Sequence, residues 1–500
     1  MIRRKRRAEL HPGEHGWQSE RRTESVLCLA PTLFPQAHFA LKSPALPPFP
    51  VGGQANSRAP TNRNAMNTPL SRRRFLRRTT LGGAGLWLIG PALRAHAKIS
   101  PNGKLDIGVI GVAGRGGDNL QGVSSENIVA LCDVDDNRLS AAARQHPAAK
   151  TYSDFRRLMD QKGIDAIVVS TPDHTHAVAA VAALKSGRHV YCEKPLTRTV
   201  SECRIVTDTA RQHQRVTQIG TQIHAGNNYR RVVELVQSGA VGAVREVHVW
   251  VNVTYGGMER PKDTPPVPAH IHYDLWLGPV AERPYNPAYL PAAWRNWWAF
   301  GGGAIADFGC HYMDLPFWAL DLKYPLVVEP VDGPPVHPES TPPWMIVRYE
   351  FPARAEKPPV QLTWYHGGKH PQVLDSLLTE DMPSYFKSGV MFVGEKGYVI
   401  SDYDRHVLLP EKDFKDFVRP APFIPASIGH HKEWIEAIKT GGKTTCHFDY
   451  SGPLTETALL GNVAFRAGKK LEWDARRLRA QNCPEADLFL QHRYRKGWTL

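Results

Sequence analysis

The sequence lacks the cysteine patterns that would suggest a metal site. Its 500 residues include seven cysteines, and none of them forms a CxxC pair or a Cys/His spacing of the zinc type. We therefore predict no metal ligands. The cysteines are predicted to be buried free thiols.

Excess positive charge is also missing from most of the chain, although the formal net charge is +14. Residues 1–97 contain 16 Lys and Arg against 4 Asp and Glu, which leaves 46 against 44 for residues 98–500. A nucleic-acid-binding surface needs clustered Lys and Arg in the folded part of a protein. We therefore expect no nucleic-acid partner.

The apolar run near the start, residues 81–93, is too short for a membrane span, which needs about 20 apolar residues. It follows SRRRFLR at residues 71–77 and precedes Ala95, His96 and Ala97. A charged segment, a short apolar segment and small residues before a cleavage point are the layout of a twin-arginine signal. This layout predicts export by the twin-arginine machinery to a periplasmic or other extracytoplasmic location, with an uncleaved anchor as the alternative.

The leader also suggests how the chain is divided. Residues 1–65 lack periodicity and are interpreted as an upstream extension or a disordered tail, with Met66 as the better start. The predicted parts are then a signal peptide (66–97), an NAD-binding Rossmann domain (98–222) and a substrate-binding α+β domain (223–500).

A glycine-rich turn follows the first apolar strand after the leader, in KLDIGVIGVAGRGG, and a second strand ends in acid, in ENIVALCDVD. Twenty-two residues separate Gly111 from Asp133, the spacing at which a carboxylate meets the ribose of NAD. The motif departs from GxGxxG because Ala113 replaces the second glycine. A glycine turn in another α/β protein is the alternative, and Asp133 favours NAD over NADP; if NADP bound more tightly, Arg138 would be the residue responsible.

Apolar strands then alternate with helical patterns, in DAIVVS (165–170), the helical stretch 174–186 and RHVYCEKPL (188–196). This alternation predicts a parallel sheet that binds ligands at the carboxyl ends of its strands. The segments STPDHTH and CEKPL resemble those of the glucose-fructose oxidoreductase and inositol dehydrogenase family. The resemblance implies that Lys194 lies beside the nicotinamide and the substrate hydroxyl.

The predicted cofactor contacts combine the glycine loop, Asp133 and the two strand-end segments. They are Gly111, Ala113, Gly114, Arg115, Gly116, Asp133, Thr171, Pro172, Asp173, His176, Glu193, Lys194 and Gln222.

The second half contains strand patterns. Valines alternate with other residues from 247 to 253, which predicts a strand with one buried face, and further extended runs lie at 345–351, 360–365, 389–393 and 407–409. We expect an open, mainly antiparallel sheet. In the family such a sheet backs the active site and its free face often contacts another subunit, so a homo-oligomer is expected.

The segment at residues 294–320 contains GGG and then Asp307 and His311, four residues apart. On a helix both would point to one face. The match to the family's GGG…DxGxH element implies that Lys194, Asp307 and His311 are catalytic. A neutral histidine can accept the hydroxyl proton, the lysine can stabilise the developing alkoxide, and the aspartate would orient the imidazole.

The expected substrate contacts are Tyr229, Arg295, Trp298 and His311. The aromatic residues Tyr273, Trp276, Trp294, Trp297 and Trp298 could equally stack on sugar rings or fill the core.

These observations favour an NAD-dependent oxidoreductase acting on a sugar or polyol hydroxyl. Two alternatives stay open: a redox-neutral glycosidase or lyase with tightly bound NAD, and a non-catalytic nucleotide-binding scaffold.

Overall fold

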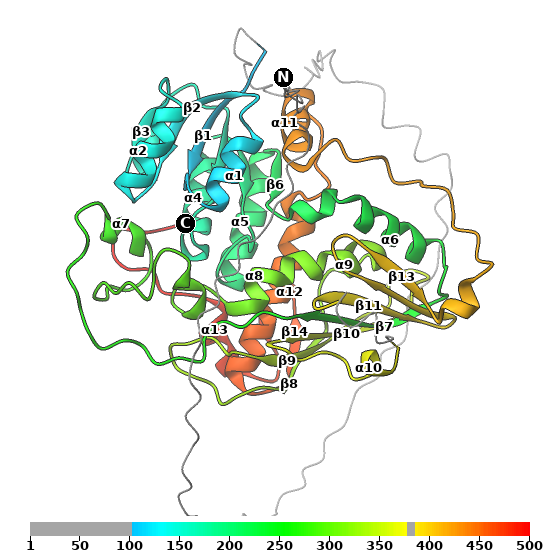
Figure 1. The fold of residues 1–500 in the computed structure, drawn as a ribbon. Helices are drawn as coiled ribbons and strands as arrows, with labels where there is room; N and C mark the ends of the chain where they lie inside the picture. Colours follow the sequence, from blue (N-terminus) through cyan, green and yellow to red (C-terminus); the bar gives the residue numbers. More distant parts are fainter. Residues whose placement is uncertain (1–102, 378–385) are drawn as a thin grey trace, which may run out of the picture. The chain divides into compact units, whose positions relative to one another are not determined.

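The computed structural model describes residues 103–377 and 386–500, and the predicted leader and everything before it lie outside this part. Within the described residues, every helix is too short or too polar to cross a bilayer. Two sheets organise the described chain (Figure 1).

The first sheet has six parallel strands, in the order β3-β2-β1-β4-β5-β6. Helices cover both of its faces, so central strands such as β4 are buried at every residue. This is the strand order of a dinucleotide-binding Rossmann domain. The bounds are β1 Asp106–Ile110, α1 Arg115–Gly122, β2 Asn127–Cys132, α2 Asp136–Gln145, β3 Lys150–Tyr152, α3 Phe155–Asp160, β4 Ala166–Val169, α4 Asp173–Lys185, β5 His189–Cys192, α5 Val200–His213 and β6 Thr217–Ile219.

The second sheet has nine strands, in the order β13-β12-β11-β7-β10-β9-β8-β14-β15. Only the β7–β10 pair is parallel among the pairs of this sheet in the described chain. The expected mainly antiparallel sheet is confirmed. Its strands are β7 Val244–Val251, β8 Val327–Asp332, β9 Met345–Phe351, β10 Val360–His366, β11 Gly389–Gly394, β12 Gly397–Ser401, β13 His406–Leu409, β14 Leu471–Asp474 and β15 Arg479–Ala480.

Helices pack on one face of this sheet and form the largest apolar core with it. In Figure 1 the helices α6, α8 and α9 lie above the strands, and α12 runs from the first sheet down to the level of β8 and β9. The remaining elements are η1 Gln222–Ala225, α6 Asn227–Gln237, α7 Tyr273–Leu277, η2 Ala293–Asn296, α8 Gly303–Tyr312, α9 Asp314–Leu320, α10 Val373–Leu377, η3 Glu411–Phe414, α11 His430–Thr440, α12 Phe448–Ala467, η4 Pro484–Ala486 and α13 Asp487–Leu490.

The prediction of one buried face for the alternating strand was wrong for β7. Its second face is covered as well, because Trp250 is only 2% exposed and packs with Leu374 and Phe386. The indole of Trp250 donates a hydrogen bond to the carbonyl oxygen of Phe386 at 2.9 Å. Covering residues that lie more than 120 positions away cannot be seen in the alternation itself.

The chain returns to the first sheet near its end. Helix α11 packs Trp434, Ile435 and Ile438 into the apolar cluster that contains β1 and β2. The amide of Ile219 in β6 donates to the carbonyl of Cys446 at 3.1 Å. Lys439 pairs with Glu126 at 2.9 Å. The nucleotide-binding half is therefore completed by residues beyond 429, which a single boundary at residue 222 does not describe.

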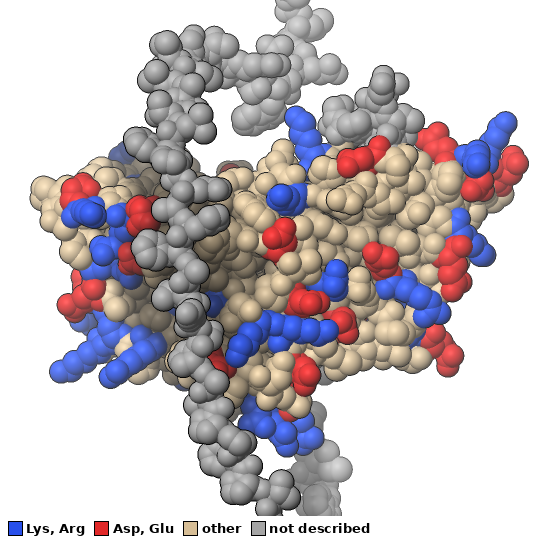
Figure 2. Space-filling view, turned by 90° about the horizontal axis from the view of Figure 1, so that it is seen from below, with Lys and Arg blue, Asp and Glu red and all other residues tan. Residues whose placement is uncertain are grey.

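The described surface carries both signs of charge. In the view of Figure 2, blue and red side chains are interspersed over the described part of this face, with no large field of one sign. This agrees with the near balance of charge in residues 98–500.

Candidate active site

The glycine loop between β1 and α1 is shaped by close packing. A Cβ on Gly116 would lie 2.0 Å from the carbonyl oxygen of Gly111, and one on Gly111 would lie 2.5 Å from that of Ser170. Gly114 differs because a Cβ there would meet nothing within 4 Å. It precedes α1 with a φ of 55° and no side-chain cap. The amides of Gly116 and Gly117 donate to the carbonyl oxygens of Ala113 and Gly114 at 3.0 and 2.9 Å, which closes a tight turn at the start of α1. The positive end of the helix dipole at this turn favours an anion.

Asp133 lies beside this loop, as the spacing predicts. Its Oδ2 accepts a hydrogen bond from the amide of Val112 at 3.0 Å and its Oδ1 accepts one from Asp135 at 3.0 Å. Burial raises the pKa of Asp133, and these two backbone bonds oppose the rise. Arg138 pairs with Asp135 at 3.2 Å, so the structure gives it a partner other than Asp133.

Further features fit a dinucleotide. A cavity of about 360 Å³ beside the loop is lined in part by Val112, Ala113, Asn137 and Arg138. The Oγ1 atom of Thr171, at the end of β4, is buried without a hydrogen-bond partner among the described residues. A glycine-rich turn at the start of a helix suits a pyrophosphate, and an acid after the second strand suits a ribose. The unused hydroxyl of Thr171 after the fourth strand could bind a further polar group.

Several of the other predicted cofactor residues hold the strand ends in place. The ring nitrogens of His176 lie 2.7 Å from the carbonyl oxygen of Thr171 and 2.8 Å from that of Pro195. Burial lowers the pKa of His176 to about 4. The Oε1 of Glu193 accepts bonds from Asn119 at 2.9 Å and Gln222 at 2.8 Å. His176, Glu193 and Gln222 therefore act as positioning residues in this structure.

Lys194 and Asp307 meet at the centre of the site. The Nζ of Lys194 lies 2.5 Å from Oδ1 of Asp307 and donates to its carbonyl oxygen at 2.6 Å. The hydroxyl of Tyr255 donates to Oδ2 of Asp307 at 2.8 Å, and Nε of Arg295 lies 3.1 Å from the same atom. Two cations and a phenol therefore surround one carboxylate.

These neighbours keep Asp307 ionised. Burial would raise its pKa, but the charges of Lys194 and Arg295 and the hydrogen bonds from Lys194 and Tyr255 hold the pKa well below its usual range. Asp173, which opens α4, is 3% exposed. Burial raises its pKa well above the ordinary value, Arg295 opposes the rise, and Asp307 adds to it.

His311 lies one turn after Asp307 on α8, as predicted. Its Nδ1 is buried and has no hydrogen-bond partner among the described residues. Burial lowers the pKa of His311 well below 6.5, and the charge of Lys194 lowers it further. The predicted orientation of this ring by Asp307 is not seen, because the carboxylate oxygens of Asp307 are bonded to Lys194 and Tyr255.

The predicted substrate residues separate in space. Arg295 joins the Asp307 cluster. Tyr229 is fully buried and its hydroxyl donates to the carbonyl oxygen of His311 at 3.2 Å, so it supports the backbone beneath the site. Trp298 instead lines a second cavity, with Arg198 and Arg466.

The aromatic residues whose role the sequence left open are mostly core. One buried cluster contains Tyr273, Trp276, Trp294 and Trp297. Tyr255, in contrast, was missed. It comes four residues after β7 ends at Val251, and its position just beyond a strand near the site was the available signal.

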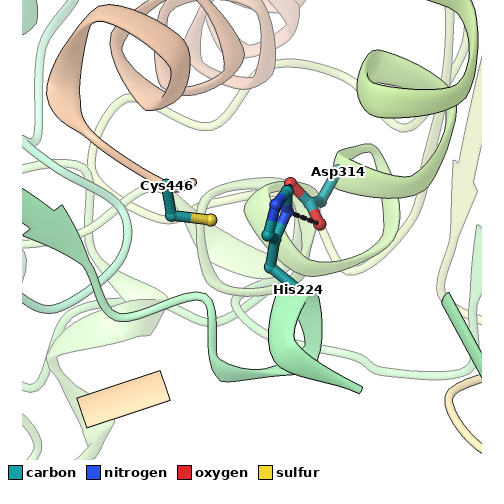
Figure 3. A group of neighbouring side chains, drawn as sticks. All are labelled: His224, Asp314 and Cys446. Atoms are coloured by element: carbon teal, nitrogen blue, oxygen red, sulfur yellow. Dashed lines mark hydrogen bonds and ion pairs between the residues drawn. The ribbon is translucent and has the colours of Figure 1, made fainter. Parts of the chain in front are cut away.

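The cysteine prediction is confirmed for the six described cysteines, which are free and buried. Cys446 belongs to a group with His224 and Asp314 whose ligand atoms lie within 4.8 Å of one another (Figure 3). Nδ1 of His224 lies 2.9 Å from Asp314, which also accepts a bond from Tyr450 at 2.7 Å. The group ties η1 to the start of α9, and the separation of its members along the chain hid it from the sequence.

Two family models match the chain. The model of an oxidoreductase family with an NAD-binding Rossmann fold matches residues 105–221, and the model of that family's C-terminal alpha/beta domain matches residues 226–356. Residues 105–221 and 226–356 are thus similar to the two domains of this oxidoreductase family, in the expected order.

Individual relatives agree with the family. The chain is 35% identical over 190 residues to a glycosyl hydrolase family 109 protein of Solibacter usitatus, covering 34% of this chain and 43% of the relative. It is 31% identical over 150 residues to an inositol 2-dehydrogenase of Salmonella paratyphi B, covering 29% and 45%. The chain thus spans less than half of the length of these curated relatives.

Solved structures share the fold. GenD2 from gentamicin A biosynthesis, solved with NAD, has a TM-score of 0.51 at 18% identity and covers 74% of this chain and 97% of its own. The WlbA dehydrogenase of Bordetella pertussis, solved with NADH and UDP-GlcNAcA, has a TM-score of 0.51 at 18% identity and covers 74% and 99%.

Proposed function

We propose that this protein transfers hydride between a secondary hydroxyl of a sugar or polyol and NAD. The observation that carries the proposal is the contact of Lys194 with Asp307 at 2.5 Å, with His311 one turn further along α8. The glycine loop, Asp133 and Thr171 would hold NAD, which would serve as the hydride carrier when bound.

The residues divide the work on the hydroxyl. A neutral His311 with an unpaired ring nitrogen can accept the hydroxyl proton. Lys194, fixed by Asp307, can place its positive charge against the developing alkoxide. Tyr255 and Arg295 hold the carboxylate of Asp307, so it stays charged and keeps the lysine in place.

A sugar or polyol is the proposed substrate class because residues of this chain are 31% identical over 150 positions to an inositol 2-dehydrogenase. A second candidate is a redox-neutral glycosidase, favoured by the similarity to the glycosyl hydrolase family 109 protein. The test is to incubate the purified full chain with sugars and glycosides and to follow nicotinamide absorbance and product mass. Net absorbance change supports the dehydrogenase, and cleaved product without net change supports the glycosidase.

The role of His311 has its own test. His311→Ala should lower kcat by about a hundredfold, the scale of a general base. NADH binding, followed by fluorescence, should be retained. Unchanged turnover in this variant would refute the assignment.

We also propose that the protein acts outside the cytoplasm after twin-arginine export, with its nicotinamide retained. The pattern at residues 71–97 supports this. Free NAD is scarce outside the cytoplasm, so a rapidly exchanging site would empty. Protein purified from the periplasmic fraction should release about one nicotinamide per chain on denaturation. An empty protein that turns over only with added NAD would contradict retention.

A homo-oligomer is proposed from the exposed remainder of the nine-stranded sheet. On β9, Ile346, Arg348 and Glu350 alternate with buried residues and are partly exposed. Light scattering coupled to size exclusion should give a mass above one chain. A monomer at micromolar concentration would refute it.

A further inference from the structure

A second cavity, which we call the arginine pocket, lies apart from the Lys194 cluster. It has a volume of about 290 Å³ and is lined by Arg198, Arg283 and Arg466, together with Trp298 and Asn462. Lys194, Asp307, His311, Tyr255 and Arg295 are not among its lining residues. The arginines come from the loop before α5, the connection after α7 and the last turn of α12.

Most donors of these guanidinium groups are unused. Arg198 donates through Nη1 to the carbonyl oxygen of Trp298 at 2.9 Å, while its Nε and Nη2 are buried without a partner among the described residues. The Nε of Arg283 is likewise buried and unpartnered. Arg466 forms no hydrogen bond or ion pair with any described residue and stacks on Trp298 at 4.9 Å.

The acids near the pocket do not balance these charges. Glu339 also lines the pocket: its Oε1 lies 4.0 Å from Arg283 and its Oε2 lies 2.7 Å from Arg260, so this one carboxylate is shared between two arginines. Glu202, near Arg198, accepts bonds from the amide of Thr199 at 2.9 Å and the hydroxyl of Tyr494 at 2.6 Å.

The electrostatics agree with a positive excess. Burial, and then the charge of Arg198, lower the pKa of Arg466 to about 10. Burial also lowers the pKa of Arg198, although Glu202 opposes this. The buried nitrogens of Arg198 and Arg283 have lost water without gaining a hydrogen-bond partner among the described residues, which is costly for a cation.

We propose that the arginine pocket binds the carboxylate or phosphate group of a small anionic molecule, at a site separate from that of hydride transfer. Planar guanidinium groups with free N–H donors match the oxygens of carboxylate and phosphate in pairs. A cavity of about 290 Å³ is at the small end of ligand sites. The proposal does not depend on the proposed function, since no residue of that chemistry lines the pocket.

The test is thermal unfolding of the purified full chain with inorganic phosphate and, separately, with citrate. Sodium chloride at equal ionic strength serves as the control for screening. Binding to the native state should raise Tm in a saturable manner. A response to phosphate alone or to citrate alone identifies which of the two groups the pocket takes.

Two variants connect the response to the pocket. Arg466→Met and Arg283→Met should each reduce the anion-dependent rise in Tm at least fivefold, while without anion Arg466→Met should unfold at the same or a higher temperature than the wild type. Arg476→Met, at an exposed arginine outside the pocket, should respond like the wild type. The proposal is overturned if neither anion gives a saturable shift, or if both pocket variants keep the full shift.

Discussion

Two buried groups of charge in this chain differ in whether the charges have partners. Around Asp307 one carboxylate meets Lys194, Arg295 and the hydroxyl of Tyr255 within 3.1 Å. In the arginine pocket, Arg198, Arg283 and Arg466 converge with donors left unpaired. The first group is arranged before any ligand arrives, as catalysis requires. The second has one carboxylate, that of Glu339, for three arginines, so an anionic ligand would add the missing negative charge.

The largest effect is expected from breaking the balanced group. Lys194→Met should lower kcat by about a hundredfold or more, because the alkoxide loses its cation and Asp307 keeps only Arg295 as an ionic partner. NADH binding should persist. Steady-state kinetics and fluorescence titration measure the two effects.

Lys185→Met, at an exposed lysine in the last turn of α4, is the matched control and should behave like the wild type. Turnover of Lys194→Met within a few fold of the control would remove Lys194 from the chemistry.

Backbone amides hold the carboxylate of Asp133, whereas cations hold that of Asp307. Asp133→Asn keeps an acceptor for the Val112 amide but removes the charge that opposes a 2′-phosphate. The ratio of NADP to NAD dissociation constants should fall about tenfold, which is the effect expected for one charged contact of about 1.4 kcal/mol. Titration with both reduced cofactors measures it.

Asp160→Asn, at a side chain 74% exposed on α3, is the control and should leave the preference unchanged. Tighter binding of NADP than NAD by the wild type would show that Asp133 does not set the preference.

A smaller change is expected when a neutral donor is removed from Asp307. Tyr255→Phe deletes one hydrogen bond while both cations remain, so kcat should fall about fivefold with KM nearly constant. Tyr398→Phe on β12 serves as the control. A fall of a hundredfold would instead make Tyr255 a proton-transfer group.

The smallest expected effect is the loss of protein stability at low pH that is due to His492, a residue that lines the arginine pocket. Burial, followed by the charge of Arg198, lowers the pKa of His492 to about 3, whereas unfolded histidine titrates near 6.5. Between these values the unfolded chain binds more protons, so stability is lost as pH falls below about 6.5. At pH 5 the share of His492 should be about 1 kcal/mol, after allowing for its partial exposure.

The measurement compares Tm at pH 7.5 and pH 5 for the wild type and His492→Gln. The variant should lose less stability on acidification, with exposed His370→Gln as the control. Asp307 does not contribute in this range, since its pKa lies below it. Equal losses in all three proteins would contradict the neutral state of His492.

Local patterns predicted most of the fold. The glycine-rich loop follows β1 as expected, and the extended run at 345–351 matches β9 at both ends. Such features depend on residues close together in the chain. Contacts across the fold were less accessible: Lys194 and Asp307 are 113 residues apart, and a resemblance to a family, not their spacing, brought them together.

The missed features have the same cause. Trp298 and Tyr229 are aromatic residues near functional motifs. Whether such a side chain reaches the substrate site depends on the direction in which it points, and the sequence does not give that direction. Trp298 faces Arg466, and Tyr229 reaches only the carbonyl of His311. The arginine pocket joins Arg198, Arg283 and Arg466 from three distant segments, so no local pattern marks it.

The packing of α11 on the first sheet determines when this protein can finish folding. Trp434 and Ile438 fill the core beside β1, and Cys446 extends the hydrogen bonding of β6. A ribosome that has made the first 222 residues has therefore not yet supplied part of the nucleotide-binding core. The core of the first domain can therefore be completed only after most of the chain has been synthesised, so this domain finishes folding late in synthesis.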